Sequence, residues 1–500
     1  MGFFNRIRFL GLGLGLVLGL HFFLIGHFVE SYPSWGDDWG FILLFDTQLS
    51  DVFYSFSSYL IPFHGGIHAN LWAKIYVIFS SFFVSDFSYL GVIWVANLLL
   101  LPILYCFGRY VRLMGHSAWH VLGIALLLYS LKGQVDNFGF IGVFQHGATV
   151  TVAVLISYLM TVQKRYLAGV LIANVSLLMI STESLGILFI SNVLLGISRH
   201  RFRYYLWVLS VLTVILYYWG IQISSGILGI QGGVIHVNLG IIPAIFIFLG
   251  GIISRIWVAL GVGILCCWVL LYPMFRSIKT VFKVGNEQRL FLPMIFFSMA
   301  TIGLLIQLGR GVDASGAISY GVLIAPRFSL YHVIPLVLLY LGILEYQSPL
   351  SLRVQGLMLL GALGFYGFNL WTQLPLLEAE QRRILCDAYV MKTQQTCLSY
   401  PMGSSDANRI VGKSWYPWPD FSTITAFKKQ SPVFYTRKEE GEITQLRCLT
   451  RLDSPFFALL VGNKRYVVSG HSISGNAFQI DLNRVQLAQL GAFKVVQLSR

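Results

Sequence analysis

Residues 9–29 read FLGLGLGLVLGLHFFLIGHFV, and the only ionisable side chains among them are His21 and His27. An apolar stretch of about 20 residues is long enough to cross the hydrocarbon core of a bilayer as a helix. Arg6 and Arg8 precede the stretch. The short apolar core and small-residue cleavage site of a signal peptide are missing. The segment therefore predicts an uncleaved transmembrane helix whose N-terminus is cytoplasmic.

The composition of the whole chain agrees with a membrane environment. Of its 500 residues, 56% are hydrophobic and only 11% are charged, whereas soluble proteins carry about 25% charged residues. The net charge of +14 does not indicate nucleic-acid binding, because Lys and Arg cluster in short loops between apolar runs. That distribution is the positive-inside pattern of membrane proteins. We expect membrane lipids as surroundings and no nucleic acid as a partner.

The order of apolar runs and basic loops predicts the architecture. We expect an α-helical polytopic membrane domain over residues 1–373, with about eleven transmembrane helices. A small extracytoplasmic domain of α/β or β character should follow at 374–500. The first outer loop, 30–86, is unusually long. Two short helices should meet at an outer turn near Ser181–Ser184, because the basic block 199–203 lies inside only if the chain has turned back.

The C-terminal region has a different composition, richer in charged residues, Pro, Ser and Asn. Runs at Phe456–Val461, Tyr466–Ser469 and Phe493–Leu498 are typical of strands. Cys386 and Cys397 are close enough in the chain for a local disulfide in an oxidising compartment. Cys448 is an alternative partner for either of them.

The first outer loop holds the candidate catalytic residues, Asp37 and Asp38, between Trp35 and Trp39. Aromatic residues mark the membrane–water boundary. A carboxylate at that depth is partly desolvated, which raises its basicity toward that of a general base. The alternative is a solvated acidic turn with interfacial tryptophan anchors. We expect Trp35 and Trp39 to contact the substrate.

Further along the same loop, His64 and His68 are four residues apart. This spacing would suit metal ligation on a helix, but Gly65 and Gly66 disfavour a regular helix there. We expect the two histidines to make polar contacts with the substrate or the loop, and we expect no metal.

Two arginines are candidates for binding a phosphate. Arg310 and Arg327 fall in or next to the outer loop between two late spans. A guanidinium at that depth can hold a phosphate bidentately. The alternative is an interfacial arginine whose charged end reaches water. Glu183, at the outer turn between the two short helices, is expensive to hold in a membrane unless it is exposed or functional, and we expect a minor functional role.

With these features the chain resembles the GT-C class of membrane glycosyltransferases. In that class the catalytic acid lies in the first extracytoplasmic loop, where Asp37 and Asp38 lie here. An Arg before a late span resembles Pro326–Phe328. Size and layout are most similar to the phage-type O-antigen glucosyltransferases. The resemblance covers the whole chain in layout, but only the Asp37–Asp38 region is a motif. The Trp-Trp-Asp signature of oligosaccharyltransferases is missing.

The resemblance implies an inverting glycosyltransferase in the bacterial inner membrane, with a cytoplasmic N-terminus and a periplasmic C-terminus. It would transfer a sugar, glucose by analogy, from a polyprenyl-phosphate donor to a lipid-linked glycan or lipopolysaccharide such as O-antigen. No cofactor or divalent metal is expected. A glycan polymerase or ligase, a transporter and an assembly protein are the alternatives. A transporter should carry ionisable residues in mid-helix, of which His146 and His332 are candidates.

Overall fold

The computed structural model describes most of the chain, which divides into two compact units. The helical unit comprises Met1–Phe23, Gln48–Ile75 and Trp94–Trp371, and the C-terminal unit comprises Leu24–Thr47, Tyr76–Ile93 and Thr372–Arg500. The described residues are 3–29, 41–46, 70–134, 139, 142–198, 200–228, 241–253, 255–284, 287–310, 320–325, 328–346, 351–394, 411, 413–426, 429–440, 443–450, 454–474 and 477–499.

The described part of the helical unit is built of helices. In chain order they are α1 (Phe3–Phe28), α5 (Leu71–Ser80), α6 (Tyr89–Asn97), η2 (Leu98–Leu100), α7 (Leu101–Leu113), α8 (Trp119–Leu128), α9 (Leu131–Gln134), η4 (Gly142–Gly147), α10 (Ala148–Ser157), η5 (Tyr158–Val162), α11 (Tyr166–Met179), α12 (Ser184–Ile197), α13 (Arg203–Leu228), α14 (Ile241–Leu249), α15 (Ile256–Val284), η6 (Glu287–Leu290), α16 (Phe291–Arg310), η7 (Gly321–Ile324), α17 (Ser329–Tyr346) and α18 (Leu352–Gln394). Helices α1, α5, α6 and α18 continue into the C-terminal unit.

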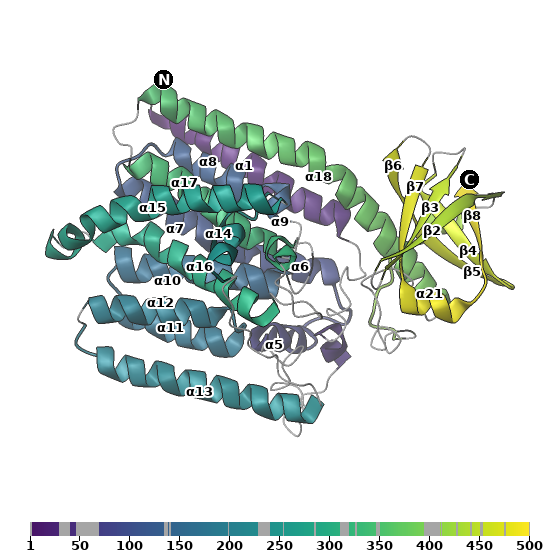
Figure 1. Ribbon diagram of the computed structural model, residues 1–500, viewed down its shortest axis with the longest axis horizontal. Coiled ribbons are helices and arrows are strands. Elements are labelled where there is room, and N and C mark those ends of the chain that lie inside the picture. The colour runs from purple at the N-terminus through teal and green to yellow at the C-terminus, as the bar shows by residue number, and fades with distance from the viewer. Residues whose placement is uncertain are drawn as a thin grey trace. The chain divides into compact units, whose positions relative to one another are not determined.

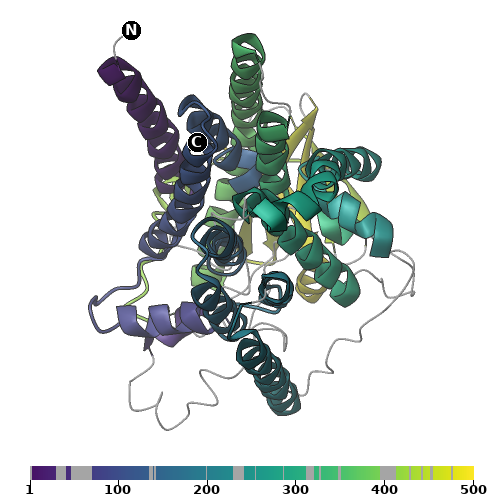
Figure 2. The same cartoon turned by 90° about the vertical axis from the view of Figure 1, so that its left-hand side faces the viewer.

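Apolar runs form helices because a helix satisfies all its backbone polar groups internally, which lipid requires. Helix α16 packs against α10, α12, α14, α15 and α17, and its buried positions, such as Phe291, Ile295 and Met299, belong to one large apolar core. Helices α11, α12 and α13 lie side by side (Figure 1). Figure 2 shows several helices of this unit almost end-on.

Several helices have the length and composition of membrane spans. Among the described residues these are Arg8–Phe28, Tyr89–Leu113, Phe144–Val162, Glu287–Leu308 and Leu352–Thr393. Shorter apolar helices accompany them. The chain thus has the features of a multi-pass membrane protein, as the sequence predicted. The count of about eleven spans stays a prediction.

The predicted pair of short helices is confirmed as α11 and α12. Polar side chains inside this apolar layer bond to one another. The Nδ2 atoms of Asn174 and Asn192 donate to the hydroxyl oxygen of Ser210 on α13, at 3.2 and 3.0 Å. Such hydrogen bonds hold neighbouring helices together where water is excluded.

Helix α18 is longer than the sequence predicted. The last span was expected to end at Gln373, but the helix continues through Pro375 to Gln394. The added segment is rich in strong helix formers, and its buried residues Cys386 and Val390 pack into the core of the C-terminal domain. Burial of that face outweighs the one backbone hydrogen bond that a proline removes.

The C-terminal domain consists of two antiparallel four-stranded sheets, which confirms its predicted β character. The first sheet has the order β1–β8–β4–β5 and the second β2–β3–β7–β6. The elements are α20 (Ser422–Thr425), β1 (Lys429–Pro432), β2 (Phe434–Glu440), β3 (Ile443–Leu449), β4 (Phe456–Val461), β5 (Lys464–Ser469), β6 (His471–Ser474), β7 (Ala477–Asn483), α21 (Arg484–Leu490) and β8 (Lys494–Ser499). The three runs predicted as strands correspond to β4, β5 and β8.

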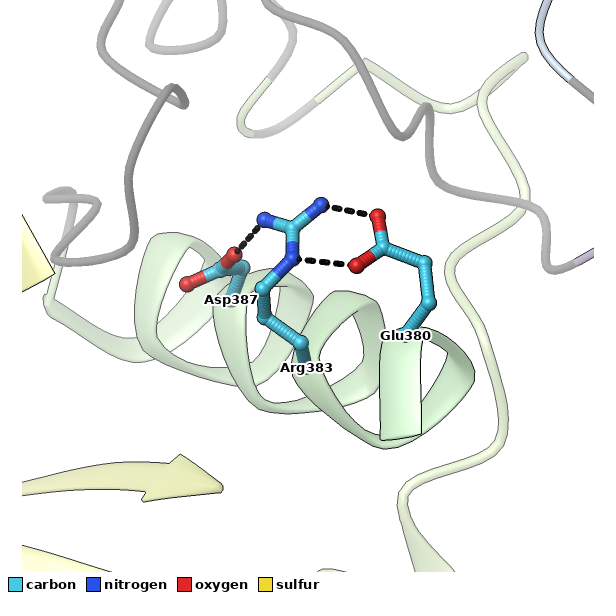
Figure 3. A network of polar contacts seen from close by, with 3 residues as sticks. All are labelled: Glu380, Arg383 and Asp387. Carbon is cyan, nitrogen blue, oxygen red and sulfur yellow. Dashed lines mark hydrogen bonds and ion pairs between the residues drawn. The ribbon is translucent and has the colours of Figure 1, made fainter. Parts of the chain in front are cut away.

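A three-residue ion cluster lies on α18 where it enters this domain (Figure 3). The guanidinium of Arg383 donates to Glu380 on one side and, at 3.0 Å, to Asp387 on the other. The side chain of Asp387 is only 3% exposed. A carboxylate this deeply buried needs a paired charge, and Arg383 supplies it.

The predicted disulfide is not formed by the cysteines that the structure describes. Cys386 and Cys448 both carry free thiols and are buried in the core of the C-terminal domain. Burial raises the pKa of the Cys448 thiol to about 12. Cys397 lies outside the described residues. Apolar packing between the helix and the sheets thus holds this core without a bond between Cys386 and Cys448.

Part of the first outer loop packs within the C-terminal unit. The Phe45 ring lies 5.4 Å from that of Phe87 and 5.2 Å from that of Trp415. The backbone N–H of Phe87 donates to the carbonyl of Trp415 at 2.9 Å. Asp46 forms an ion pair with Lys413. These contacts join segments that are far apart in the chain.

Candidate functional site

The candidate site is organised by η4 (Gly142–Gly147), a turn of π-helix at the start of α10. A π-helical turn holds one more residue than an α-helical turn, and such turns are frequent at functional sites because they re-aim side chains. Here the two adjacent residues Gln145 and His146 are both buried and bond to different parts of the helical unit.

Gln145 connects the first outer loop, at Asn70, to the turn between α11 and α12. The side-chain amide nitrogen of Asn70 donates to Gln145 Oε1 at 3.1 Å. Gln145 Nε2 in turn donates to Glu183 Oε1 at 3.0 Å. All three residues are at most 6% exposed. Donors that point successively toward a carboxylate polarise one another, so this buried chain is stronger than two isolated hydrogen bonds would be.

The backbone of Asn70 adds a second connection to the same turn. Its N–H donates to the carbonyl of Ile180 at 2.8 Å, and its φ of 41° lies in the left-handed region. Asn tolerates this conformation better than most residues. The site therefore uses both the backbone and the side chain of Asn70 to fix where α5 begins within the first outer loop.

Helix α5 makes two further contributions. The indole N–H of Trp72 donates to the carbonyl of Phe144 in η4 at 2.8 Å, and the two rings lie 4.4 Å apart. Lys74, one turn after Asn70, is only 6% exposed. Burial lowers its pKa from the usual 10.5 to about 8. A mostly protonated, poorly hydrated amine thus lies in a helix within the first outer loop.

His146 connects η4 to the beginning of α17. Its Nδ1 shares a 3.1 Å hydrogen bond with the hydroxyl of Tyr331, and its ring meets the Phe328 ring edge-on at 5.3 Å. Phe328 directly follows Arg327, the candidate phosphate-binding residue. His332, the next residue after Tyr331, donates instead to the carbonyl of Leu323 at 2.7 Å, which is a structural role.

The turn between α11 and α12 is polar inside. Each of these helices has 14 residues and therefore rises about 21 Å, less than the roughly 30 Å of hydrocarbon in a bilayer. Polar groups that are buried among apolar helices are satisfied by other protein groups. The hydroxyls of Thr182 and Tyr217 bond at 2.8 Å, and those of Ser181 and Thr149 at 3.5 Å.

Among the described residues, the site brings together an acid, amides, an imidazole, tyrosines and a lysine. The amides bond to one another and hold the carboxylate of Glu183 in a dry environment. The described residues contain no cluster of three or more His, Cys, Asp or Glu able to hold a metal ion.

Of the residues predicted from the sequence, Glu183 is the one whose side chain the structure places in this network. Helix α16 ends at Arg310, and nothing of that side chain is described. The remaining predicted site residues lie outside the described residues: Trp35, Asp37, Asp38, Trp39, His64, His68 and Arg327. Their roles stay predictions.

Neither Gln145, which donates to Glu183, nor Asn70, which donates to Gln145, was predicted from the sequence as a site residue. Asn70 closes the polar run that begins at His64, and Gln145 and His146 form a polar pair within a predicted apolar span. Such a pair was a usable signal, because polar residues are retained in membrane helices when they are bonded or functional. Lys74, in an otherwise apolar helix, gave the same kind of signal.

No family model, no curated protein and no solved structure matches this chain.

Proposed function

We propose that the chain is an inverting glycosyltransferase of the GT-C type, with about eleven membrane spans. It transfers a sugar, by analogy glucose, from a polyprenyl-phosphate carrier to a glycan such as O-antigen on the outer side of the bacterial inner membrane. Asp37 or Asp38 is the general base, and Arg327 with Arg310 binds the donor phosphate.

One observation carries the proposal: η4 connects three segments that the sequence analysis had singled out independently. Gln145 binds the first loop at Asn70 and the carboxylate of Glu183. His146, the neighbour of Gln145, contacts Phe328, the residue after Arg327. A transferase needs the loop that carries its base and the helix start that carries its phosphate ligand to be held near each other.

The contacts of the first loop with the C-terminal unit support the predicted topology. Asp46 pairs with Lys413, and Phe45 packs on Trp415. Polar segments that touch outside the helices lie on the same side of a membrane. A first loop on the same side as the C-terminus requires an odd number of spans, as the basic loops also predict.

In the proposed reaction, the carboxylate of Asp37 or Asp38 accepts the proton of an acceptor hydroxyl. The acceptor oxygen forms a bond to the anomeric carbon as the bond from that carbon to the phosphate oxygen breaks. The electron pair of the broken bond stays on the departing polyprenyl phosphate, where a guanidinium neutralises it. Attack opposite the leaving group inverts the configuration. Glu183 helps to position the loop without touching the reacting atoms.

The test is mass spectrometry of surface glycans from cells with the chain, without it, and with Asp37→Asn and Asp38→Asn, singly and together. We expect a hexose increment that needs the chain and at least one of the two aspartates. Asp46→Asn is the matched control, since Asp46 is an exposed carboxylate in the same loop. Normal transfer by both single variants and the double variant would rule out the proposed base.

A transporter is the second candidate, because the helical unit buries ionisable side chains. His21, His146, Glu183 and His332 are each at most 6% exposed. Identical glycans in all the strains above, together with uptake or efflux that depends on the chain, would favour transport. A glycan polymerase or ligase would instead change the length of the glycan or its attachment to lipid.

A further inference from the structure

The second sheet of the C-terminal domain has a distinctive outer face. Strands β3 and β7 alternate between buried and accessible residues. Leu446 and Ile480 point into the core, which places Arg447 and Gln479 on the other side of the sheet. This outer face combines an apolar end with a polar row.

The apolar end consists of Phe434 and Leu449. They are paired across β2 and β3, and they are 88% and 68% exposed. Directly paired residues have their Cβ atoms about 5 Å apart on one face of a sheet. Two large apolar side chains next to each other give this end of the outer face a small apolar platform.

The polar row crosses three strands. Arg447 on β3 is paired with Gln479 on β7, which is paired with His471 on β6. Gln479 Nε2 donates to Asp481 Oδ1 at 2.9 Å, and His471 Nδ1 lies 4.0 Å from Asp481 Oδ2. These contacts hold an amide and a carboxylate in place, with a guanidinium paired next to them. Together the row offers fixed donors and acceptors on one plane.

We propose that this face, defined by Phe434, Leu449, Arg447, Gln479, Asp481 and His471, binds the carbohydrate chain of the acceptor. A pyranose ring has one flat C–H face, which fits an apolar platform, and neighbouring hydroxyls, which fit paired donors and acceptors. The proposal rests on the proposed function and adds the place at which the acceptor is held.

The charge and size of the face favour a glycan over other macromolecules. Arg447 and Asp481 balance each other, so the face suits an uncharged polyol better than the phosphate backbone of a nucleic acid. An apolar patch of two side chains is small for the core of a stable protein interface. Charged residues along β2, including Arg437 and Lys438, discourage pairing with a foreign strand.

The test measures binding separately from transfer. The full-length chain in lipid nanodiscs is titrated with fluorescently labelled polysaccharide. The polysaccharide is extracted from the surface of the cells that produce the chain. We expect Gln479→Ala and Phe434→Ser each to raise the Kd by about fivefold or more. The acceptor KM should rise equally, while kcat at saturating acceptor stays unchanged. The controls are Gln430→Ala and Lys464→Ala, two exposed positions of the other sheet.

Unchanged Kd values in both face variants would overturn the proposal, as would failure of the unmodified chain to bind the polysaccharide. The two proposals fail in different ways. If the chain binds polysaccharide through this face but transfers no sugar, the binding surface is supported and the proposed transferase function is wrong. If the chain transfers sugar with the same KM in the face variants, the transferase function is supported and the binding surface is wrong.

Discussion

Gln145 and Glu183 are 38 positions apart in the chain and share a 3.0 Å hydrogen bond from an amide nitrogen to a carboxylate oxygen. Both side chains are buried, so water does not compete for either group. Gln145 also accepts from Asn70. The two hydrogen bonds together fix the position of Asn70 in the first loop relative to η4 and to the turn that precedes α12. Disturbing them should affect stability and transfer together.

The first prediction compares two replacements of Glu183. Glu183→Ala removes the acceptor of the Gln145 amide and should lower the free energy of unfolding by about 1–3 kcal/mol, the cost of an unmade buried hydrogen bond. Glu183→Gln keeps an acceptor oxygen and should lose less. The apparent midpoint temperature in detergent micelles measures the difference. Glu378→Ala, at an exposed site on α18, is the control. Equal midpoints for the two Glu183 variants would contradict the role assigned to the bond.

The second prediction separates the backbone of Asn70 from its side chain. Asn70→Gly keeps the left-handed backbone available but removes the bond to Gln145. Asn70→Ala loses the bond and also meets the steric cost of φ near 41°. We therefore expect the highest midpoint temperature for the unmodified chain, a lower one for Asn70→Gly and the lowest for Asn70→Ala. A midpoint for Asn70→Ala at or above that of Asn70→Gly would show that the left-handed conformation is not maintained in solution.

Much of the helical fold could be predicted from the sequence. Long apolar runs and basic loops mark the spans, and the break at Ser181–Ser184 marks the pair α11 and α12. The runs Phe456–Val461 and Tyr466–Ser469 were predicted as strands from their composition, and they correspond to β4 and β5. The length of α18 did not, because the residues after Pro375 form helix only when Cys386 and Val390 find a core to cover.

The candidate site was predicted only in part. Glu183 stood out because a carboxylate within the membrane thickness is costly. Its partner Gln145 is 38 positions away, and Asn70 is 75 positions from Gln145, to which it donates. Periodicity carries no information about such pairings. The π-helical turn that aims Gln145 and His146 in different directions also leaves no sequence pattern of its own.

The third prediction concerns the ion cluster on α18. Arg383→Met leaves the carboxylate of Asp387, 3% exposed, without its charged partner. It should lower the stability of the C-terminal domain by about 1.5–3 kcal/mol. The neighbouring Arg382→Met removes a contact of 3.8 Å to an exposed glutamate, and surface pairs contribute about 0–1 kcal/mol. Resistance to limited proteolysis measures the stability of the C-terminal domain in both variants. Equal sensitivity of the two variants would contradict the distinction.

The fourth prediction uses alkylation of Cys448 to report local unfolding of the C-terminal domain. Its thiol is buried, and burial raises its pKa to about 12, so little thiolate exists at pH 8. We expect no alkylation of the folded domain by a maleimide over an hour, and complete alkylation in denaturant, with peptide mass mapping as the measurement. Arg383→Met should speed alkylation and Arg382→Met should not. Rapid alkylation of the unmodified chain would place Cys448 at the surface.

The last prediction concerns pH and Lys74. Burial lowers the pKa of Lys74 from 10.5 to about 8. Below pH 8 the amine is protonated in both the folded and the unfolded state. Between about pH 8 and 10.5 the folded chain releases this proton while the unfolded chain keeps it, so the unfolded state binds more protons. Stability contributed by this site therefore rises with pH across that window.

The variant Lys74→Met removes the titrating group. The midpoint temperature of the unmodified chain should accordingly increase relative to that of Lys74→Met as the pH goes from 7.5 to 10. Lys429→Met is the control, because Lys429 is exposed, and its difference from the unmodified chain should not vary with pH in the same way. A difference between the unmodified chain and Lys74→Met that is constant from pH 7.5 to 10 would mean that Lys74 is solvated. The amine would then be unavailable as a poorly hydrated cation beside the Asn70 turn.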